Sequence, residues 1–238
     1  MRKIIGLFVI LKLFIISGLS GCTSVEPSSN PPKLDNKQKI FTDDFSHVDE
    51  TRWIIEMEQK GHSRVYAENN RLVLNTFGGV TVWFNQPLSG DYVITYKRGF
   101  IFSGGENDRL SDLNQFWLAF DPQRSNLFTR SGALAEYDNV NLWYMGMGGN
   151  YNETTRFRWY DGTGERHLLQ EFLSADALLK KSVEYEVITQ VKGHKTRVWI
   201  NGELLFEGDL RHPDISGYFG FRSTYSHQYI KDFAVYRH

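Results

Sequence analysis

Apolar and polar side chains alternate along most of the chain, and Gly, Asn, Asp and Pro interrupt the alternation at short intervals. A period of two is typical of β-strands with one buried face, whereas an amphipathic helix repeats about every 3.6 residues. The pattern therefore predicts many short strands and a single short helix, over residues 174–181. The predicted strands cover residues 71–75, 81–84, 92–100, 113–120, 141–147, 154–160, 185–191, 196–200, 203–207, 218–224 and 229–237.

Turn chemistry supports the same interpretation. Asn201-Gly202 separates two predicted strands, and this dipeptide is a strong hairpin signal because a type I′ turn needs positive φ at both positions. Evenly spaced antiparallel strands without helical crossovers are typical of sandwiches and jelly rolls. We therefore expect an all-β fold, a β-jelly-roll sandwich of two antiparallel sheets.

The alternation also sorts side chains onto faces. In several strands one face is purely apolar, as with Phe157 and Trp159, and is expected to pack between the sheets. The opposite face carries Arg, Tyr, Trp or Gln, which are typical of ligand contacts because guanidinium groups pair with carboxylates. An alternative is that stacked Arg and Tyr pairs only stabilise the sheet. The predicted ligand face consists of Gln115, Trp117, Tyr144, Arg156, Arg158, Tyr218 and Arg222.

Two glycine-rich segments break the alternation, over residues 104–109 and 146–152. Loops at the end of a sandwich often carry function, so we expect substrate contacts from Asn107, Asp108 and Asn150. Both segments also have structural explanations. A β-bulge or wide turn needs glycine, and Asp108 with Arg109 could form an ion pair that stabilises its loop.

The first residues form a separate unit. Arg2 and Lys3 precede an apolar run over residues 4–16, and Leu19-Ser20-Gly21-Cys22 follows it. This arrangement resembles the lipobox of bacterial lipoproteins. Lys12 interrupts the run, which is too short for a transmembrane anchor. We expect a signal peptide over residues 1–21, a flexible tether over 22–39 lipidated at Cys22, and a β-jelly-roll domain over 40–238.

That arrangement implies an outer-membrane lipoprotein, periplasmic or surface-exposed, held to the membrane through its lipid. Cys22 is the only cysteine, so disulfides, thiolate metal sites and cysteine nucleophiles are excluded from the folded part. Acidic groups outnumber basic ones once residues 1–21 are removed, which does not suit a nucleic-acid partner. We expect a monomer.

No cofactor or catalytic metal is expected. The histidines other than His227, including His62, His167, His194 and His212, have no spacing typical of metal ligands. A structural Ca²⁺ is an alternative, since Asp43, Asp44 and Asp232 could meet where the first and last strands pair.

Three motifs carry a family resemblance. They cover residues 104–117, 148–158 and 217–227, the last closing on 232–237. Together they resemble a concanavalin A-like family of Bacteroidetes polysaccharide-utilisation loci, similar to the YesU group, over nearly all of residues 41–238. The resemblance implies a two-sheet β-jelly roll that helps to degrade plant or algal glycans. It also implies an oligosaccharide substrate that contains uronic acid, from a polysaccharide such as ulvan or pectin.

The predicted ligand face suits β-elimination on a uronic acid. The C5 proton becomes acidic when the adjacent carboxylate is neutralised, a role expected for Arg156 and Arg158. His227 or Tyr144 is then the expected base or acid. The predicted activity is that of a carbon–oxygen lyase, either a polysaccharide lyase or an oligosaccharide dehydratase, acting on an anionic oligosaccharide or polysaccharide.

Two alternatives remain open. A non-catalytic glycan-binding lipoprotein would use Trp117 as an aromatic platform. A glycoside hydrolase would need two carboxyl groups about 5–10 Å apart, and no predicted strand carries a Glu-x-Asp-x-(x)-Glu pattern. Asp108 and Asp112, in one loop, are the acids on which hydrolysis would depend.

Overall fold

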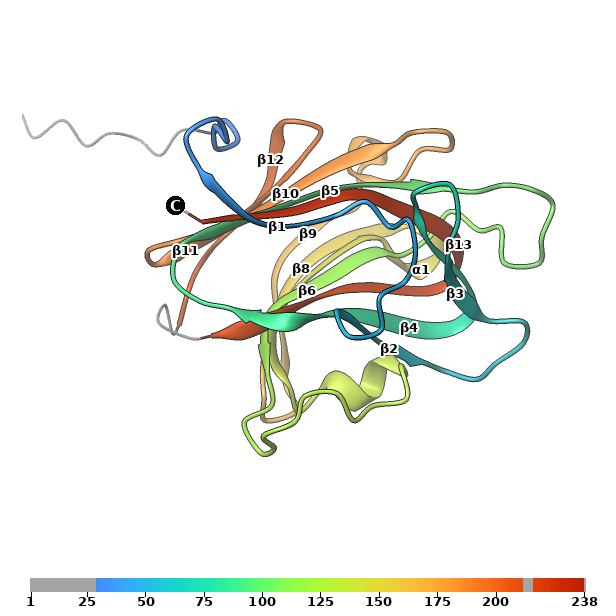
Figure 1. Cartoon of the computed structure of the whole chain (residues 1–238), viewed down its shortest axis with the longest axis horizontal. Helices are drawn as coiled ribbons and strands as arrows, with labels where there is room; N and C mark the ends of the chain where they lie inside the picture. The colour runs from blue at the N-terminus through green and yellow to red at the C-terminus, as the bar shows by residue number, and fades with distance from the viewer. Residues whose placement is uncertain (1–28, 212–215, 238) are drawn as a thin grey trace, which may run out of the picture.

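The computed structural model describes residues 29–211 and 216–237; Cys22 and the expected signal peptide lie outside these ranges. Within them the chain forms strands β1 to β13, which pair antiparallel throughout (Figure 1). The strands are β1 (Gln38–Asp43), β2 (Trp53–Met57), β3 (Arg64–Ala67), β4 (Leu72–Leu88), β5 (Tyr92–Phe100), β6 (Leu113–Phe120), β7 (Asn141–Gly148), β8 (Thr154–Asp161), β9 (Arg166–Phe172), β10 (Tyr185–Lys192), β11 (Lys195–Ile200), β12 (Glu203–Asp209) and β13 (Gly217–Arg237).

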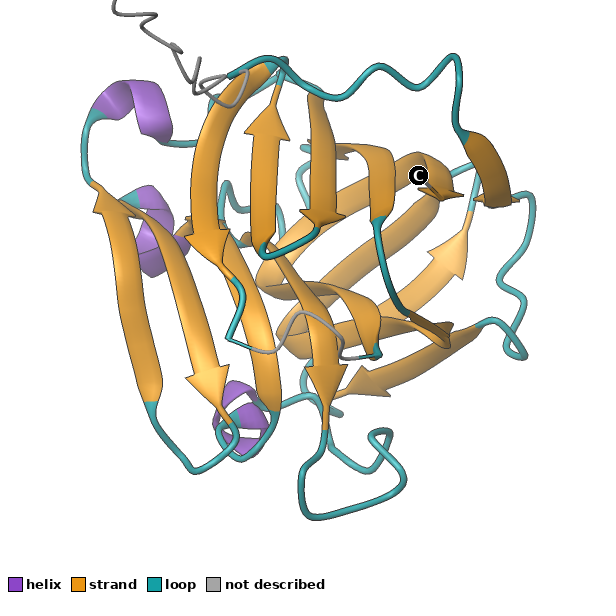
Figure 2. Ribbon diagram, turned by 90° about the vertical axis from the view of Figure 1, so that its left-hand side faces the viewer, coloured by secondary structure: helices purple, strands orange, loops and turns teal. Residues whose placement is uncertain are grey.

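The strands form two layers, with the helical turns confined to the connections (Figure 2). The first layer contains β1, β5, β10, β11 and β12, and the second contains β2 and β6 to β9. The long strands β4 and β13 take part in both. The first half of β13 pairs with β6, and its second half pairs with β5 and β1.

The main core fills the space between the layers. Trp117, Phe157 and Phe221 enter it from the second layer and are fully buried. Ile94 and Val198 enter it from the first. These residues are the apolar members of alternating strands, so the packing follows from the period-two pattern. The predicted all-β sandwich of two antiparallel sheets is confirmed.

A second, smaller core lies on the other side of the second layer, which we call the outer face. Residues 121–140, which connect β6 to β7 and contain the 3₁₀ turn η1 (Leu134–Tyr137), fold back over this face. The residues that pack there are Trp83, Phe116, Ala119, Leu127, Tyr137, Val140, Leu142, Tyr144 and Tyr160. The connection covers one end of the outer face, while Arg156 and Arg158 of β8 stay partly exposed.

The strand predictions hold in position but not always in extent. β5 and β6 have the predicted bounds, whereas residues 71–75 and 81–84 belong to one long strand, β4. The helix expected over 174–181 is wrong: this segment forms only the 3₁₀ turn η2 (Ala175–Ala177). No helix within the described ranges has the length and apolar character needed to cross a bilayer.

Candidate functional site

Side chains from adjacent strands line up in two rows across the outer face. One row is polar and consists of Thr81, Arg222, Asn114, Gly146, Arg156 and Glu171, which pair in register from β4 to β9. The next row is mainly aromatic and consists of Trp83, Gly220, Phe116, Tyr144, Arg158 and Leu168. Because paired residues point to the same side of a sheet, the register brings Tyr144, Arg156 and Arg158 together as predicted.

Tyr144 and Arg158 form the centre of this surface. The Arg158 guanidinium lies 5.7 Å from the centre of the Tyr144 ring. The phenol of Tyr144 extends over Gly146, because a Cβ at position 146 would overlap the phenol oxygen. Burial raises the pKa of Tyr144, and the nearby Asp112 carboxylate raises it further. At neutral pH Tyr144 is therefore a protonated phenol beside a cation.

A hydrogen-bonded network extends the site toward the loops. Asp112 Oδ1 accepts a hydrogen bond of 3.0 Å from Asn114 Nδ2, and its Oδ2 lies 3.3 Å from a guanidinium nitrogen of Arg109. The Oδ1 atom of Asn114 is buried and has no hydrogen-bond partner among the described residues. An acceptor left without a donor in a folded protein is costly, which makes this oxygen an unusual feature of the polar row.

Arg222 and Tyr218 also point to the outer face, but the connection over residues 121–140 covers them. Arg222 is fully buried, and its guanidinium donates to the carbonyl of Gly132. Tyr218 packs edge-on against Phe128, with 4.9 Å between ring centres. The prediction that Arg222 contacts substrate is therefore wrong, because a segment distant in sequence occupies its donors.

Gln115 and Trp117 point into the main core, so their predicted place on the ligand face is wrong. Trp117 is fully buried between the layers, where its indole nitrogen donates to Thr196 Oγ1 over 2.9 Å. Gln115 accepts from the Tyr96 hydroxyl and donates to Thr189 in the same core. The alternation separated them correctly from Phe116, but both faces of β6 are apolar and buried, so the pattern did not reveal which one faces outward.

His227 forms a pair with Asp108 beneath the loop that follows β5. His227 Nδ1 lies 2.8 Å from Asp108 Oδ1, and the backbone N–H groups of Ser103, Gly104 and Gly105 donate to the other oxygen. Burial acts to raise the pKa of Asp108, but these hydrogen bonds outweigh it and lower the pKa. His227 Nε2 is buried without a partner in the described part of the chain. The ion pair expected between Asp108 and Arg109 does not form; Asp108 pairs with His227 instead.

The structure does not bring His227 and Tyr144 together. Tyr144 pairs with Phe116 of β6, and Phe116 pairs with Gly220 of β13. His227 lies seven residues after Gly220 on β13. Seven residues of β-strand span roughly 20 Å, so the two side chains cannot contact one sugar bond. Of the two predicted acid–base residues, only Tyr144 shares a surface with Arg156 and Arg158.

The loop residues Asn107 and Asn150 differ in accessibility. Asn107 is buried and donates to Asn75 Oδ1 over 2.7 Å, which does not suit the predicted substrate contact. Asn150 is exposed in the turn α1 (Gly149–Asn152), where three consecutive residues have positive φ; these are Asn150, Tyr151 and Asn152. Sequence reasoning missed Tyr151, although its place in a glycine-rich turn was visible.

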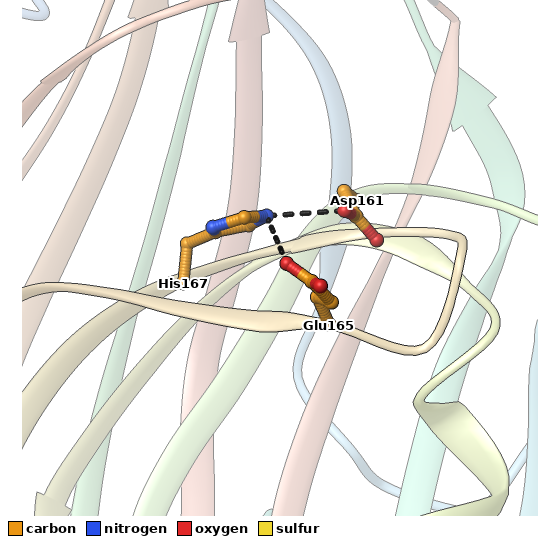
Figure 3. Close-up of side chains that lie close together, drawn as sticks. All are labelled: Asp161, Glu165 and His167. Carbon is orange, nitrogen blue, oxygen red and sulfur yellow. Dashed lines mark hydrogen bonds and ion pairs between the residues drawn. The ribbon is translucent and has the colours of Figure 1, made fainter.

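Asp161, Glu165 and His167 converge at the β8–β9 hairpin, where their ligand atoms lie within 4.8 Å of one another (Figure 3). The histidine spacing had not indicated this group. His167 Nε2 lies 3.0 Å from Asp161, and its ring stacks on Trp159. Burial acts to raise the pKa of Asp161, but hydrogen bonds from Thr163 and His167 outweigh it and lower it to about 2. Trp159 and His167 point away from the outer face, so this group lies apart from Tyr144 and Arg158.

The aspartates considered for Ca²⁺ are already occupied. Asp43 accepts from the Phe45 amide and the Trp53 indole, and Asp232 pairs with Lys97. Asp43, Asp44 and Asp232 line one pocket of about 600 Å³, but they are not a group of closely spaced ligand atoms within the described ranges.

Comparisons with solved structures show that other proteins have the same fold. The chain is similar to a protein of unknown function with a galectin-like fold from Bacillus subtilis (15% identity, 84% of this chain and 98% of that chain, TM-score 0.68). It is similar to an endo-β-1,3-glucanase from Pyrococcus furiosus (11%, 89% and 98%, TM-score 0.58). It is also similar to a carbohydrate-binding module from Bacillus subtilis (10%, 78% and 96%, TM-score 0.51). At these identities the likeness concerns the fold alone.

No curated protein matches the chain. A family model described as "Domain of unknown function (DUF6250)" matches residues 74–233, from β4 to the last part of β13. This match spans both rows of the outer face and most of the sandwich. The chain therefore belongs to the DUF6250 family.

Proposed function

We propose that this protein acts on an oligosaccharide that carries a carboxylate, and that Arg158 on the outer face binds this carboxylate. One observation carries the proposal. Among residues 29–211 and 216–237, Arg156 is paired with Glu171 over 2.6 Å and Arg109 with Asp112, whereas Arg158 forms no ion pair. A half-buried guanidinium without a counterion, stacked on Tyr144, offers a forked donor that fits a carboxylate.

The proposed reaction is β-elimination. Arg158 neutralises the uronate carboxylate and so acidifies the C5 proton. The ionised form of Tyr144 takes this proton, the C4–O bond breaks as the C4=C5 double bond forms, and Tyr144 returns the proton to the leaving oxygen. His227 is too far from Arg158 to serve as the base, which leaves Tyr144 for both proton transfers.

Hydrolysis is the second candidate, because two of the solved structures with this fold are named glucanases. Retaining and inverting hydrolases need two carboxyl groups about 5–10 Å apart. On the outer face, Glu56 of β2 is occupied by hydrogen bonds from Trp83, Tyr137 and Arg130. Asp112 precedes β6 and Glu171 lies on β9, three strands away. Three strands span roughly 14 Å, and both carboxylates are already paired with arginines. We therefore propose elimination first, while the likeness to structures named glucanases supports hydrolysis as its alternative.

The test is to incubate the purified protein with size-defined oligogalacturonates and ulvan oligosaccharides and to follow ultraviolet absorbance. Elimination creates a conjugated double bond, so absorbance should rise with uronate substrates and not with a neutral β-1,3-glucan oligosaccharide. Arg158→Ala should lower the rate roughly 100-fold or more. Arg166→Ala is the matched control, because Arg166 lies on the adjacent strand and is paired with Asp138.

Other outcomes point to the alternatives. New saturated reducing ends without an absorbance rise would indicate hydrolysis, with activity then lost in Asp108→Asn or Asp112→Asn. Glycan affinity without any change in glycan mass would indicate a binding module. Equal elimination rates for wild type and Arg158→Ala would remove Arg158 from the site.

A further inference from the structure

A cluster of aromatic side chains surrounds Arg109 beside the proposed site. The Arg109 guanidinium carbon lies 4.4 Å from the centre of the Tyr151 ring and 4.6 Å from that of Tyr225. Phe77 contacts Tyr225 on its other side, with 4.8 Å between ring centres. Tyr151 is 74% exposed and Phe77 45% exposed, so the cluster presents aromatic surface to solvent. Isolated exposed rings are common, but a group of them around one cation needs a further explanation.

Backbone strain indicates that these rings are held in place. Tyr151 and Tyr225 both have positive φ, of 62° and 45°, a region that bulky residues rarely adopt. The turn that carries Tyr151 is fixed from behind, because Asn152 exchanges two hydrogen bonds of 2.9 Å with the backbone of Leu179. Strain of this kind persists where the surrounding fold enforces it, and it concentrates at ligand sites.

The cluster connects directly to the proposed site. Arg109 contacts Asp112, Asp112 accepts from Asn114, and Asn114 is in register with Gly146 beneath the Tyr144 phenol. Between the two regions lies the unpartnered Oδ1 of Asn114. Tyr151 precedes Thr154, and the four residues from Thr154 to Arg158 span roughly 13 Å of strand, more than one pyranose ring covers.

We propose that Tyr151, with Arg109 and Tyr225 behind it, forms a second sugar-binding subsite. Its exposed ring stacks on the apolar face of a neutral sugar residue in the oligosaccharide whose carboxylate Arg158 binds. The inference rests on the proposed function and adds to it a minimum substrate length: the preferred ligand has at least two sugar residues, with an uncharged one beyond the uronate. Aromatic rings suit this role because their apolar faces match the C–H faces of sugars.

The test is isothermal titration of a size series of oligosaccharides, from mono- to hexasaccharide, in which one uronate is joined to an increasing number of neutral sugar residues. Wild-type affinity should increase with length. Tyr151→Ala should lose roughly three- to tenfold in affinity for the tetrasaccharide and nothing for the monosaccharide. Tyr151→Phe should bind as wild type, because it keeps the ring. Tyr151→Gly should behave as Tyr151→Ala, and it removes the ring without adding strain at positive φ.

Tyr236→Ala is the matched control, since Tyr236 is also stacked by a cation, Lys39, but lies in the first layer. A length dependence that is the same in wild type and in both ring-less variants would overturn the subsite, while loss of monosaccharide binding in Arg158→Ala would still support the proposed function. Absence of binding by wild type to every member of the series would overturn both proposals.

Discussion

A glycine fixes the position of the tyrosine proposed to transfer protons. Tyr144 and Gly146 are separated by one residue on β7, so both face outward, and the Tyr144 ring lies along the strand over Gly146. A side chain at position 146 would leave no room for this rotamer. The lack of a Cβ is therefore what places the phenol beside Arg158.

Gly146→Ala should displace the Tyr144 ring, because the new methyl group would overlap the phenol oxygen and lie 2.7 Å from Cε1 of the ring. We expect the elimination rate to fall roughly tenfold to 100-fold, at a cost of about 1–3 kcal/mol in the free energy of unfolding. Initial rates and urea unfolding measure the two effects. Gly105→Ala is the control, since a methyl group there meets only ordinary contacts. Full activity in Gly146→Ala would show that the phenol is not needed in this position.

The pH dependence of activity tests the identity of the base. Burial and Asp112 raise the pKa of Tyr144, while Arg158 and Arg222 lower it to a smaller extent. Below a raised pKa the phenolate fraction increases about tenfold per pH unit. The rate constant kcat/KM should therefore rise continuously from pH 6 to pH 9 in initial-rate measurements, and Tyr144→Phe should abolish it. A rate that does not change over this range would show that Tyr144 is not the base.

The sequence allowed part of the site to be predicted. Alternation placed Tyr144, Arg156 and Arg158 on one surface, because period-two patterns survive wherever a strand is regular. It could not show that Gln115 and Trp117 point inward, since Phe116 on the opposite face is also buried beneath residues 121–140. Nor could it reveal the pairing of His227 with Asp108, which are far apart in the sequence.

At the scale of elements, one buried carboxylate attaches the connection over residues 121–140 to the sheet. Glu56 of β2 accepts hydrogen bonds from the Trp83 indole, the Tyr137 hydroxyl and the backbone N–H of Arg130, at 2.7, 2.8 and 2.6 Å. Charge-assisted hydrogen bonds of this kind are stronger than neutral ones. Glu56 therefore holds the connection that covers Arg222 and limits the open part of the outer face.

Glu56→Ala should leave these three donors without their acceptor and should lower the free energy of unfolding by about 2–4 kcal/mol. Residues 121–140 should then become the first site of limited proteolysis. Glu56→Gln retains one acceptor oxygen and should lose less. Urea unfolding and mass spectrometry of the early fragments measure both effects, with the exposed Glu50→Ala as control. An unchanged cleavage pattern in Glu56→Ala would mean that apolar packing alone holds the connection.

Strands with strong alternation were predicted and weak ones were missed. β9 has no buried residue, because it is an edge strand with solvent on its free side, so it lacks the pattern that reveals a strand. The short strands β1 and β3 also have no buried residue. The predicted hairpin at Asn201-Gly202 does form between β11 and β12, with positive φ at both residues.

At the scale of the whole molecule, a buried cation ties the two layers together. Arg98 of β5 is fully buried and donates to Gln228 and to the backbone carbonyls of Asn114 and Arg222. Its three acceptors lie on β6 and on both halves of β13. Asn114 and Arg222 also belong to the polar row of the outer face. Arg98 therefore holds the strands of the proposed site in place from the side of the main core.

The fold class could be predicted because the signal for it comes from the whole chain and not from one segment. Two sheets that each bury one face impose the same alternation on most central strands. The pattern that indicates the fold class is therefore repeated in many strands. The path of β13 was not visible, because a strand that passes from one layer to the other keeps its alternation on both sides of the bend. The bend lies at Tyr225, which has positive φ, where the pairing with β4 shifts register between Thr224 and Ser226.

The position of β13 in the chain has a consequence for biosynthesis. Residues 217–237 supply a central strand to both layers, and they leave the ribosome after every other described strand. Until they emerge, β6 has no neighbour on one side and β5 cannot join β1, so neither sheet can close around the core. The two sheets can therefore close around the main core only after translation has passed this segment.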